Sequence, residues 1–231
     1  MAELAKLVAS YLNNDLHCAL KGPMPEDSIF DDILKPLPLL ILISGPSGVG
    51  KDSVVKALLR RQLSLHFVVT TTNRAPRSDE KEGVDYFFVD KEQFEKFITE
   101  DEMLEYAVVY GHYKGIRKTQ IREAMGSGKD VIVRLDVQGV KKVKSLCQEA
   151  VTIFIVPANT EEWLLRLKNR NTETPEDFQL RMETARSELQ QLPDYEYVVV
   201  NARDRLEETV NVIEAIIKTE HHRVHPRRIT L

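Results

Sequence analysis

The chain has 231 residues, of which 42% are hydrophobic and 29% are charged, and its formal net charge is -4 at pH 7. This size allows one hydrophobic core with a small inserted lobe, and the acidic balance argues against a general nucleic-acid-binding protein. Two cysteines, Cys18 and Cys147, are too few for a disulfide framework and favour a reducing compartment. The longest apolar run, around 37–43, is too short to span a membrane.

Residues 1–36 are expected to form an N-terminal extension. Apolar residues between Leu4 and Leu12 recur at helical spacing, which predicts a short helix packed against the body. The segment lacks the basic start and apolar block of a secretory signal, and its acidic residues are unusual for an organelle transit peptide. A regulatory or partner-binding arm is the alternative interpretation.

Apolar runs then alternate with helical patterns, which predicts a parallel sheet covered by helices. The runs are rich in Val and Ile and barely alternate with polar residues, as expected of strands buried on both faces. The predicted strands are 39–44, 66–71, 130–136, 151–156 and 195–201. The predicted helices are 51–63, 117–127, 138–148, 160–170, 175–191 and 204–220. The fold class is therefore α/β, with a parallel five-stranded core sheet and helices on both faces.

Two segments interrupt this rhythm. Residues 73–114 contain a turn-forming, charged stretch, then DYFFV, a short helical pattern and EMLEYAVVYG, which together predict a small mixed lobe inserted between core strands. The tail HHRVHPRRITL, residues 221–231, has histidines without acidic or cysteine partners at ligand spacing. We expect this tail to be a solvated end and not a metal site.

The stretch GPSGVGKDS follows the first predicted core strand and precedes a predicted helix. Gly45, Gly50 and Lys51 satisfy the pattern G-x-x-x-x-G-K in the strand-to-helix context that this motif requires. Glycines let backbone N–H groups turn inward, the helix start adds positive potential, and the lysine places a charge near the β and γ phosphates. The predicted ATP-binding residues of this stretch are Gly45, Pro46, Ser47, Gly48, Val49, Gly50, Lys51, Asp52 and Ser53.

Asp52 departs from this motif, which normally has a Ser or Thr hydroxyl after its lysine to bind Mg²⁺. A carboxylate is a stronger oxygen ligand, but it brings negative charge close to the phosphates. Ser53 lies about 100° further round the helix, so it does not take the vacant place. We expect Asp52 to contact Mg²⁺ directly or through a water, so that the loop still binds ATP with Mg²⁺.

Further polar residues suit a second phosphate and a base. Arg74 and Arg77, with Tyr86 nearby, are typical of a phosphate held by forked, charge-assisted hydrogen bonds. Glu105 is suited to accept from the N1–H and amino groups of guanine, since adenine has no N1–H. Taken alone, the arginines are more often a solvated turn and the glutamate an ordinary exposed carboxylate.

Two arginines, Arg166 and Arg170, lie four residues apart on one predicted helical face. Like charges at this spacing repel by roughly 0.2–0.5 kcal/mol unless an anion joins them. Arg181 follows in the next predicted helix. An ordinary cationic helix surface explains this spacing equally well.

Taken together, these motifs are familiar. From GPSGVGK through TTTNRAPR, EGVDYFFV, LEYA, LDVQGV and RLKNRNTET, the chain resembles the guanylate kinases over residues 37–218, most of all their plant organellar branch. The resemblance implies a P-loop nucleoside monophosphate kinase fold over residues 37–231. It divides this domain into a core (37–72, 115–158 and 192–220), a GMP-binding lobe (73–114), a helical lid (159–191) and a tail (221–231).

The resemblance also implies a function. It is Mg²⁺-dependent transfer of the γ-phosphate of ATP to GMP, and to dGMP, by a monomer that binds neither nucleic acid nor membrane. Chloroplast or mitochondrion is the implied location, with the cytoplasm as the alternative. The implied catalytic residues are Lys51, Arg74, Arg166, Arg170 and Arg181. The implied GMP-binding residues are Thr70, Arg74, Arg77, Tyr86, Glu105, Lys114, Asp136 and Gln138. Asn201 would join the adenine side of the ATP site, and Asp136 would join Asp52 near the metal.

Three positions depart from the family's pattern. Lys114 stands where a second tyrosine would donate to the GMP phosphate, and a lysine supplies charge there without the phenol's geometry. Ile116 replaces a hydroxyl residue that would help hold the base, and Asn73 stands where Thr is common. Two other functions therefore stay open: an inactive guanylate-kinase-like module that binds a protein partner, and another nucleoside monophosphate kinase or a broader ATPase. The first typically loses the phosphate loop, which is present here.

Overall fold

This computed structural model describes residues 36–231 apart from 62, 110 and 169–174. The chain divides into two compact units, Met1–Pro36 and Leu37–Leu231, and the description below concerns the second. The predicted helix near Leu4–Leu12 lies outside the described residues, as does Cys18. Within the described part of the chain, no helix is long and apolar enough to cross a membrane.

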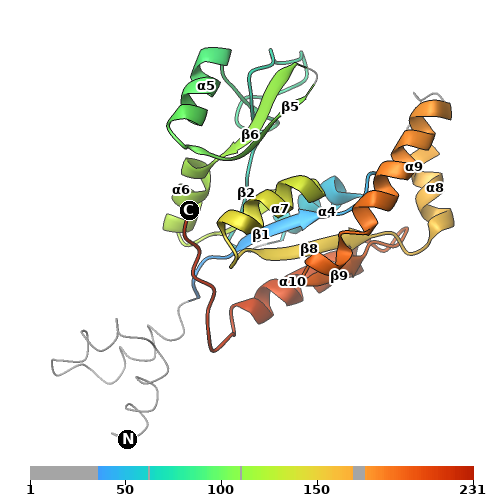
Figure 1. Cartoon of the computed structure of the whole chain (residues 1–231). Coiled ribbons are helices and arrows are strands. Elements are labelled where there is room, and N and C mark those ends of the chain that lie inside the picture. Colours follow the sequence, from blue (N-terminus) through green and yellow to red (C-terminus); the bar gives the residue numbers. More distant parts are fainter. Residues whose placement is uncertain (1–35, 62, 110, 169–174) are drawn as a thin grey trace, which may run out of the picture. The chain divides into compact units, whose positions relative to one another are not determined.

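A five-stranded sheet forms the core, in the order β2-β7-β1-β8-β9 (Figure 1). Every neighbouring pair is parallel. The central strand β1 is buried at all five positions, which is why the sequence reads as a continuous apolar run there. The predicted parallel five-stranded sheet is therefore confirmed. Its strands are β1 (Leu40–Ser44), β2 (Leu65–Phe67), β7 (Asp130–Arg134), β8 (Val151–Val156) and β9 (Tyr197–Val200).

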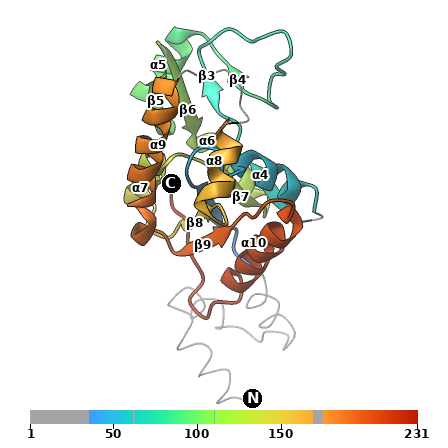
Figure 2. The ribbon, with the colours of Figure 1, turned by 90° about the vertical axis from the view of Figure 1, so that its right-hand side faces the viewer.

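Helices cover both faces of this sheet, and Figure 2 shows α7 and α10 on opposite sides of the strands. Successive residues of a strand point to opposite faces. Ile41 and Ile43 accordingly pack in one apolar cluster with α4 (Lys51–Leu59), α8 (Thr160–Lys168), α9 (Pro175–Leu189) and α10 (Leu206–Glu220). Leu40 and Leu42 pack in a second cluster with α6 (Lys118–Gly126) and α7 (Val137–Leu146). The core thus consists of two apolar layers separated by one sheet.

A smaller mixed sheet forms the inserted lobe, in the order β4-β3-β6-β5. Strand β3 pairs parallel with β4, whereas β6 pairs antiparallel with both β3 and β5. Phe94 of the lobe's helix is fully buried and stacks on Tyr113, with 5.0 Å between ring centroids. This aromatic contact gives the lobe an apolar centre of its own. Its elements are β3 (Thr71–Thr72), β4 (Phe87–Phe88), α5 (Lys91–Thr99), β5 (Met103–Val109) and β6 (His112–Arg117).

Two predicted elements were wrong in extent. The run 66–71 is not one strand, because β2 ends at Phe67 and the chain then crosses to the lobe, where the amide of Phe87 donates to the carbonyl of Thr70 at 2.9 Å. The predicted helix 51–63 ends at Leu59, since the next two amides bond three residues back and tighten the last turn. The other predicted core strands and helices begin and end within two residues of the observed bounds.

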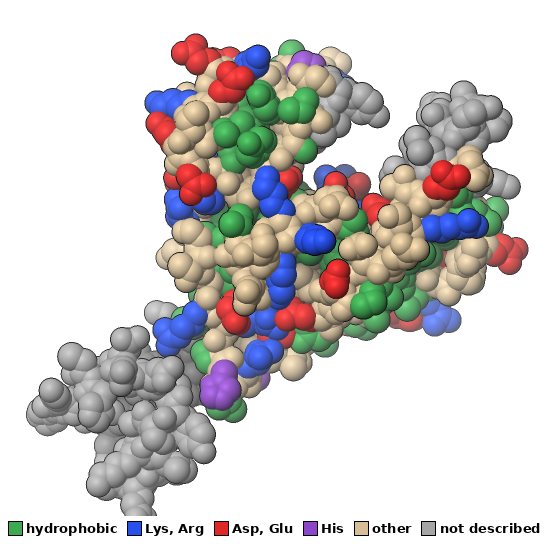
Figure 3. All heavy atoms as spheres, viewed as in Figure 1, with side chains coloured by type: hydrophobic (Ala, Val, Ile, Leu, Met, Phe, Trp, Pro, Cys, Tyr) green, Lys and Arg blue, Asp and Glu red, His purple; other side chains and the backbone are tan. Residues whose placement is uncertain are grey.

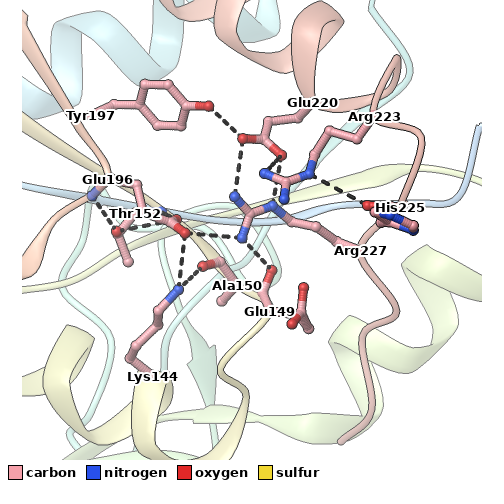
Figure 4. A network of polar contacts seen from close by, with 10 residues as sticks. All are labelled: Lys144, Glu149, Ala150, Thr152, Glu196, Tyr197, Glu220, Arg223, His225 and Arg227. Atoms are coloured by element: carbon pink, nitrogen blue, oxygen red, sulfur yellow. Dashed lines mark hydrogen bonds and ion pairs between the residues drawn. The ribbon is translucent and has the colours of Figure 1, made fainter.

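The tail, residues 221–231, is exposed over most of its length, as the sequence suggested, but Arg227 anchors it to the rest of the domain. The side chain of Arg227 is only 6% exposed and donates to both carboxylate oxygens of Glu220, at 2.7 and 3.0 Å (Figure 4). It also donates to Glu196 at 3.0 Å, and the Tyr197 hydroxyl donates to Glu220. Ile229 packs against the second apolar cluster. The reason is that α10 ends on a buried carboxylate, which needs a cation brought to it by the tail.

Candidate active site

The phosphate loop joins the carboxyl end of β1 to the start of α4. Gly50 is the N-cap residue of α4 and has φ +90°, which non-glycine residues rarely adopt. At Gly45, a Cβ atom would lie 2.2 Å from the carbonyl oxygen of Ile155 in the neighbouring strand β8. The loop therefore requires glycine for two different reasons, backbone conformation and close approach. In the space-filling view, the surface is hollowed between the lobe that carries α5 and the helices α8 and α9 (Figure 3).

Three side chains support this loop through its carbonyl oxygens. The Asn201 amide donates to Val49 O at 2.7 Å, the indole of Trp163 donates to Ser47 O at 2.8 Å, and Arg166 Nη1 donates to Val49 O at 3.2 Å. None of these three bonds uses a loop N–H group, so none of them competes with a bound anion for those donors. Asn201, predicted to join the adenine side of the ATP site, has its side chain buried behind the loop, where it also accepts from Thr209 at 3.1 Å. Its structural role is thus to shape the loop.

Lys51 lies over the loop that it follows. Its ammonium donates to the carbonyl oxygens of Gly45 and Pro46, which keeps a positive charge at the loop's mouth. A carboxylate that the sequence did not indicate, Glu188 of α9, faces the same place. Burial raises the pKa of Glu188, while the charge of Lys51 and a backbone hydrogen bond from Ser47 lower it and the charge of Asp136 raises it. No short motif marks this residue, which reaches the loop only through the packing of α9.

Asp52, the unusual residue of the loop, forms an ion pair with Arg134. Arg134 is the last residue of β7, and in the sheet it lies opposite Ile43 of β1, close to the start of the loop. The structure gives Asp52 a cation of the protein as its partner, and the expected contact of Asp52 with Mg²⁺ stays a prediction. Arg134 was not predicted, because nothing in the local sequence connects it with a residue 82 positions earlier. Ser53, the next residue of α4, is exposed.

Two of the cations predicted for the GMP phosphate, Arg74 and Lys114, lie close to Tyr86 in the lobe. The guanidinium of Arg74 lies 5.3 Å from the ring centroid of Tyr86, and the ammonium of Lys114 lies 5.4 Å from the same ring. Arg74 forms two bonds with Glu80, at 2.7 and 2.9 Å, and the backbone N–H of Arg77 donates to Glu80 at 2.8 Å. The bonds from Arg74, which have the largest effect, and the bond from the Arg77 backbone lower the pKa of Glu80 to about 2. This role of Glu80 was not predicted, although the sequence has this acidic residue three positions after Arg77.

Glu105 lies on β5 and is half-buried. Burial raises its pKa, the charge of Lys142 on α7 lowers it, and the charge of Asp136 raises it. Lys142 also lies over the ring of Tyr106, 4.6 Å from the centroid, so one cation of α7 reaches the strand that carries Glu105. Opposite Glu105 in the sheet lies Ile116, which is 3% exposed and belongs to the second apolar cluster.

The remaining predicted residues are described by their backbone contacts and exposure. Asp136 is the N-cap of α7 and accepts from the amide of Gly139 at 2.7 Å, and Gln138 is exposed in the first turn of the same helix. Thr70 is half-buried at the crossing into the lobe. Asn73, a departure from the family's pattern, accepts from the amide of Tyr113 at 2.7 Å and so joins the end of β3 to β6.

Of the three arginines predicted for the lid, the structure places one at the loop. Arg166 contacts Val49 and forms an ion pair with Glu162, four residues earlier on α8. Arg170 lies outside the described residues, and Arg181 is placed only as a backbone position in α9. The expected cooperation of all three thus stays a prediction.

A glycine loop at the carboxyl end of a central parallel strand, with a cationic cluster in a separate small lobe, defines a P-loop protein of the nucleoside monophosphate kinase fold. The protein-family model of guanylate kinase matches residues 38–220. The chain therefore belongs to the guanylate kinase family.

Individual relatives agree with this assignment. The chain is 45% identical over 197 residues to guanylate kinase 2, chloroplastic/mitochondrial, of Oryza sativa subsp. japonica, covering 85% of this chain and 69% of that protein. It is 43% identical over 186 residues to a guanylate kinase of Clostridium perfringens, covering 80% and 85% of the two chains. The crystal structure of guanylate kinase from Anaplasma phagocytophilum has a TM-score of 0.64 and 30% identity, and the match covers 83% of this chain and 90% of that one.

Proposed function

We propose that this protein transfers the γ-phosphate of ATP to GMP, and to dGMP, giving ADP and GDP. The observation that supports this best is that an intact phosphate loop and a second cationic cluster occur together in a chain of the guanylate kinase family. An inactive binding module would have no need of the loop's lysine or of the three side chains that support the loop.

On the donor side, the N–H groups of the loop and the start of α4 bind the ATP phosphates, and Lys51 lies at the β and γ phosphates. Asn201 and Trp163 hold the loop in this shape from behind. Because their bonds are made with loop carbonyls, they orient the N–H groups without competing with the nucleotide. Arg166, already at the loop, brings a further positive charge to this side.

On the acceptor side, Arg74, Arg77, Tyr86 and Lys114 hold the GMP phosphate. Glu80 keeps the Arg74 guanidinium in a fixed fork, the geometry that suits two phosphate oxygens. Glu105 accepts from the N–H edge of guanine, assisted by Thr70. Its carboxylate must be ionised for this purpose. Burial raises the pKa of Glu105 above its ordinary value, and the nearby charge of Lys142 opposes this rise and favours the ionised form.

The reaction itself needs no general base, since the attacking phosphate oxygen of GMP is already an anion. A bond forms from this oxygen to the γ-phosphorus. The bond between the γ-phosphorus and the β–γ bridging oxygen breaks, and ADP leaves with that electron pair on its oxygen. The residues of the chain act by alignment and by neutralising the charge that spreads over the transferred group. Arg166, Arg170 and Arg181 would close over this group and exclude water, which would otherwise hydrolyse ATP.

The donor set beside the loop fits magnesium, which prefers oxygen ligands and keeps several waters. Asp136 and Glu188 supply carboxylates there, and the described residues offer no hydrogen-bond partner to Oε2 of Glu188. We propose that these two carboxylates bind the magnesium ion, while Asp52 is paired with Arg134. When bound, Mg²⁺ neutralises charge on the β and γ phosphates.

The substrates are small molecules, and we propose that the protein is a monomer. We propose chloroplast or mitochondrion as its location, the compartments named for the rice relative, with the cytoplasm as the alternative.

An acceptor panel tests this function. The full chain with ATP and Mg²⁺ is given GMP, dGMP, AMP or UMP in separate reactions, and nucleoside diphosphates are separated chromatographically. GDP and dGDP should form, at rates at least about a hundredfold above those with AMP or UMP, because Glu105 would face no N1–H in adenine. ADP formed at one rate whatever the acceptor would indicate a broader ATPase, and the absence of any product would indicate a binding module.

A further inference from the structure

The ion pair between Asp52 and Arg134 lies beside the phosphate loop. Asp52 is the second residue of α4, directly after Lys51, and Arg134 ends the strand that pairs with β1. The two residues thus meet beside the loop, where the carboxyl end of β7 lies close to the start of α4. Their side chains are 55% and 40% exposed, so the pair borders the open side of the loop and is not part of the core.

A carboxylate at this place has two opposite effects. It is favourable for α4, since negative charge in the first turn interacts well with the helix dipole. It is unfavourable for a nucleotide, because the same N-terminus is where the phosphates bind. A negative unit charge within several ångströms of the bound triphosphate raises the dissociation constant of the nucleotide. This holds even in a partly exposed site, although solvent weakens the repulsion there. The loop therefore needs a means to cancel the charge of Asp52.

We propose that Arg134 is a positioning residue for the donor nucleotide: it pairs with Asp52, turns this carboxylate from the phosphates and cancels its charge. The inference rests on the proposed function, in that the nucleotide concerned is ATP. It explains how a loop with Asp in place of the usual hydroxyl still offers a cationic surface to a triphosphate. An ordinary exposed ion pair, worth at most about 1 kcal/mol to the fold, is the alternative, and it predicts no effect on ATP.

A double-mutant cycle separates the two. The variants are Arg134→Gln, Asp52→Asn and the double variant, with Arg134→Lys as the conservative replacement. Arg61→Gln is the matched control, since it breaks another partly exposed ion pair, Arg61–Glu207 at 2.6 Å, just beyond the end of α4. ATP dissociation constants are measured by calorimetric titration in EDTA and in excess Mg²⁺, which requires no turnover. The dissociation constant of GMP and the thermal midpoint are measured for each variant.

Arg134→Gln should weaken ATP binding about tenfold in EDTA, because Asp52 is left unbalanced. The double variant should return to within about threefold of the unaltered protein, and Arg134→Lys should do the same. GMP binding should change less than about twofold throughout, and Arg61→Gln should change neither ligand.

Two results would overturn the proposal. One is an Arg134→Gln variant that binds ATP within about twofold of the unaltered protein. The other is a double variant as weak as Arg134→Gln, because Arg134 would then act on the nucleotide without Asp52. Failure of the proposed function is distinguishable, since it would appear as absent GDP formation in the unaltered protein whatever these binding constants are.

Discussion

Replacing Arg227 with Met should destabilise the fold strongly, because it leaves the buried carboxylate of Glu220 without the cation that donates to both of its oxygens (Figure 4). The side chain of Glu220 is 1% exposed, and Arg227 donates to both of its oxygens. Breaking a buried pair in this way costs roughly 3–5 kcal/mol. The carboxyl can instead take up a proton, which at pH 7 costs about 3.7 kcal/mol from an ordinary pKa of about 4.3. The two figures agree, so a loss of about 3–4 kcal/mol is expected.

In a domain of this size, 1 kcal/mol shifts the melting temperature by about 2–4 °C, so Arg227→Met should melt on the order of 10 °C lower at pH 7. The assay is thermal unfolding followed by circular dichroism. Arg223→Met is the control, because Arg223 is 47% exposed and lies 3.5 Å from the same carboxylate, a pair worth less than about 1 kcal/mol.

The pH dependence has a definite sign. Burial raises the pKa of Glu220, but the bonds from Arg227 and Tyr197 lower it by more, so its pKa in the folded protein is below the ordinary value. This contribution to stability is present above the unfolded pKa and is lost as pH falls through the folded pKa. In Arg227→Met, burial is no longer opposed by Arg227, and protonation relieves the cost. The gap in melting temperature should therefore narrow between pH 7 and pH 4. A gap that does not change with pH, or one equal to that of Arg223→Met, would refute the reasoning.

Three further predictions concern the active site. Asn201→Asp removes the amide that donates to the loop and should raise the KM for ATP by about 5- to 30-fold with little change for GMP; equal rises in steady-state kinetics would contradict a role specific to the loop. Gly50→Ala, with φ +90° and a Cβ 2.6 Å from the amide nitrogen of Asn201, should weaken ATP binding more than about tenfold, whereas Gly128→Ala, with φ +77° and open space, should leave it unchanged. Lys142→Met removes a charge that lowers the pKa of Glu105, so the acid limb of kcat/KM for GMP should move to higher pH; an acid limb that stays in place would mean that this pKa does not control GMP use.

Much of the core could be predicted from the sequence because its strands are buried on both faces. The run 39–44 reads as continuous apolar residues since alternate side chains enter two different clusters. The run 66–71 also contains β-branched and aromatic residues typical of a strand, yet it divides between two sheets. Its strand partners are β7 on one side and β4 and β6 on the other, and no local pattern states which distant strand supplies a hydrogen bond.

The site shows the same division between local and distant signals. The phosphate loop and the arginines after β3 could be predicted, because their spacing along the chain is itself the signal. The partners that complete the site could not: Arg134 beside Asp52, Glu188 at the loop and Lys142 near Glu105 are all brought in by folding. The anchoring of the tail was not predicted for the same reason, since the partner of Arg227 is buried at the end of α10.

The central claim is that one chain binds two nucleotides and passes a phosphoryl group directly between them. The most direct test supplies ATP labelled at its γ-phosphate, together with GMP and Mg²⁺, to the full chain and locates the label in the products. The label should appear at the β-phosphate of GDP, in the same amount as ADP is formed, and Lys51→Ala should abolish both. Label that appears as inorganic phosphate, or that stays on the protein, would contradict direct transfer.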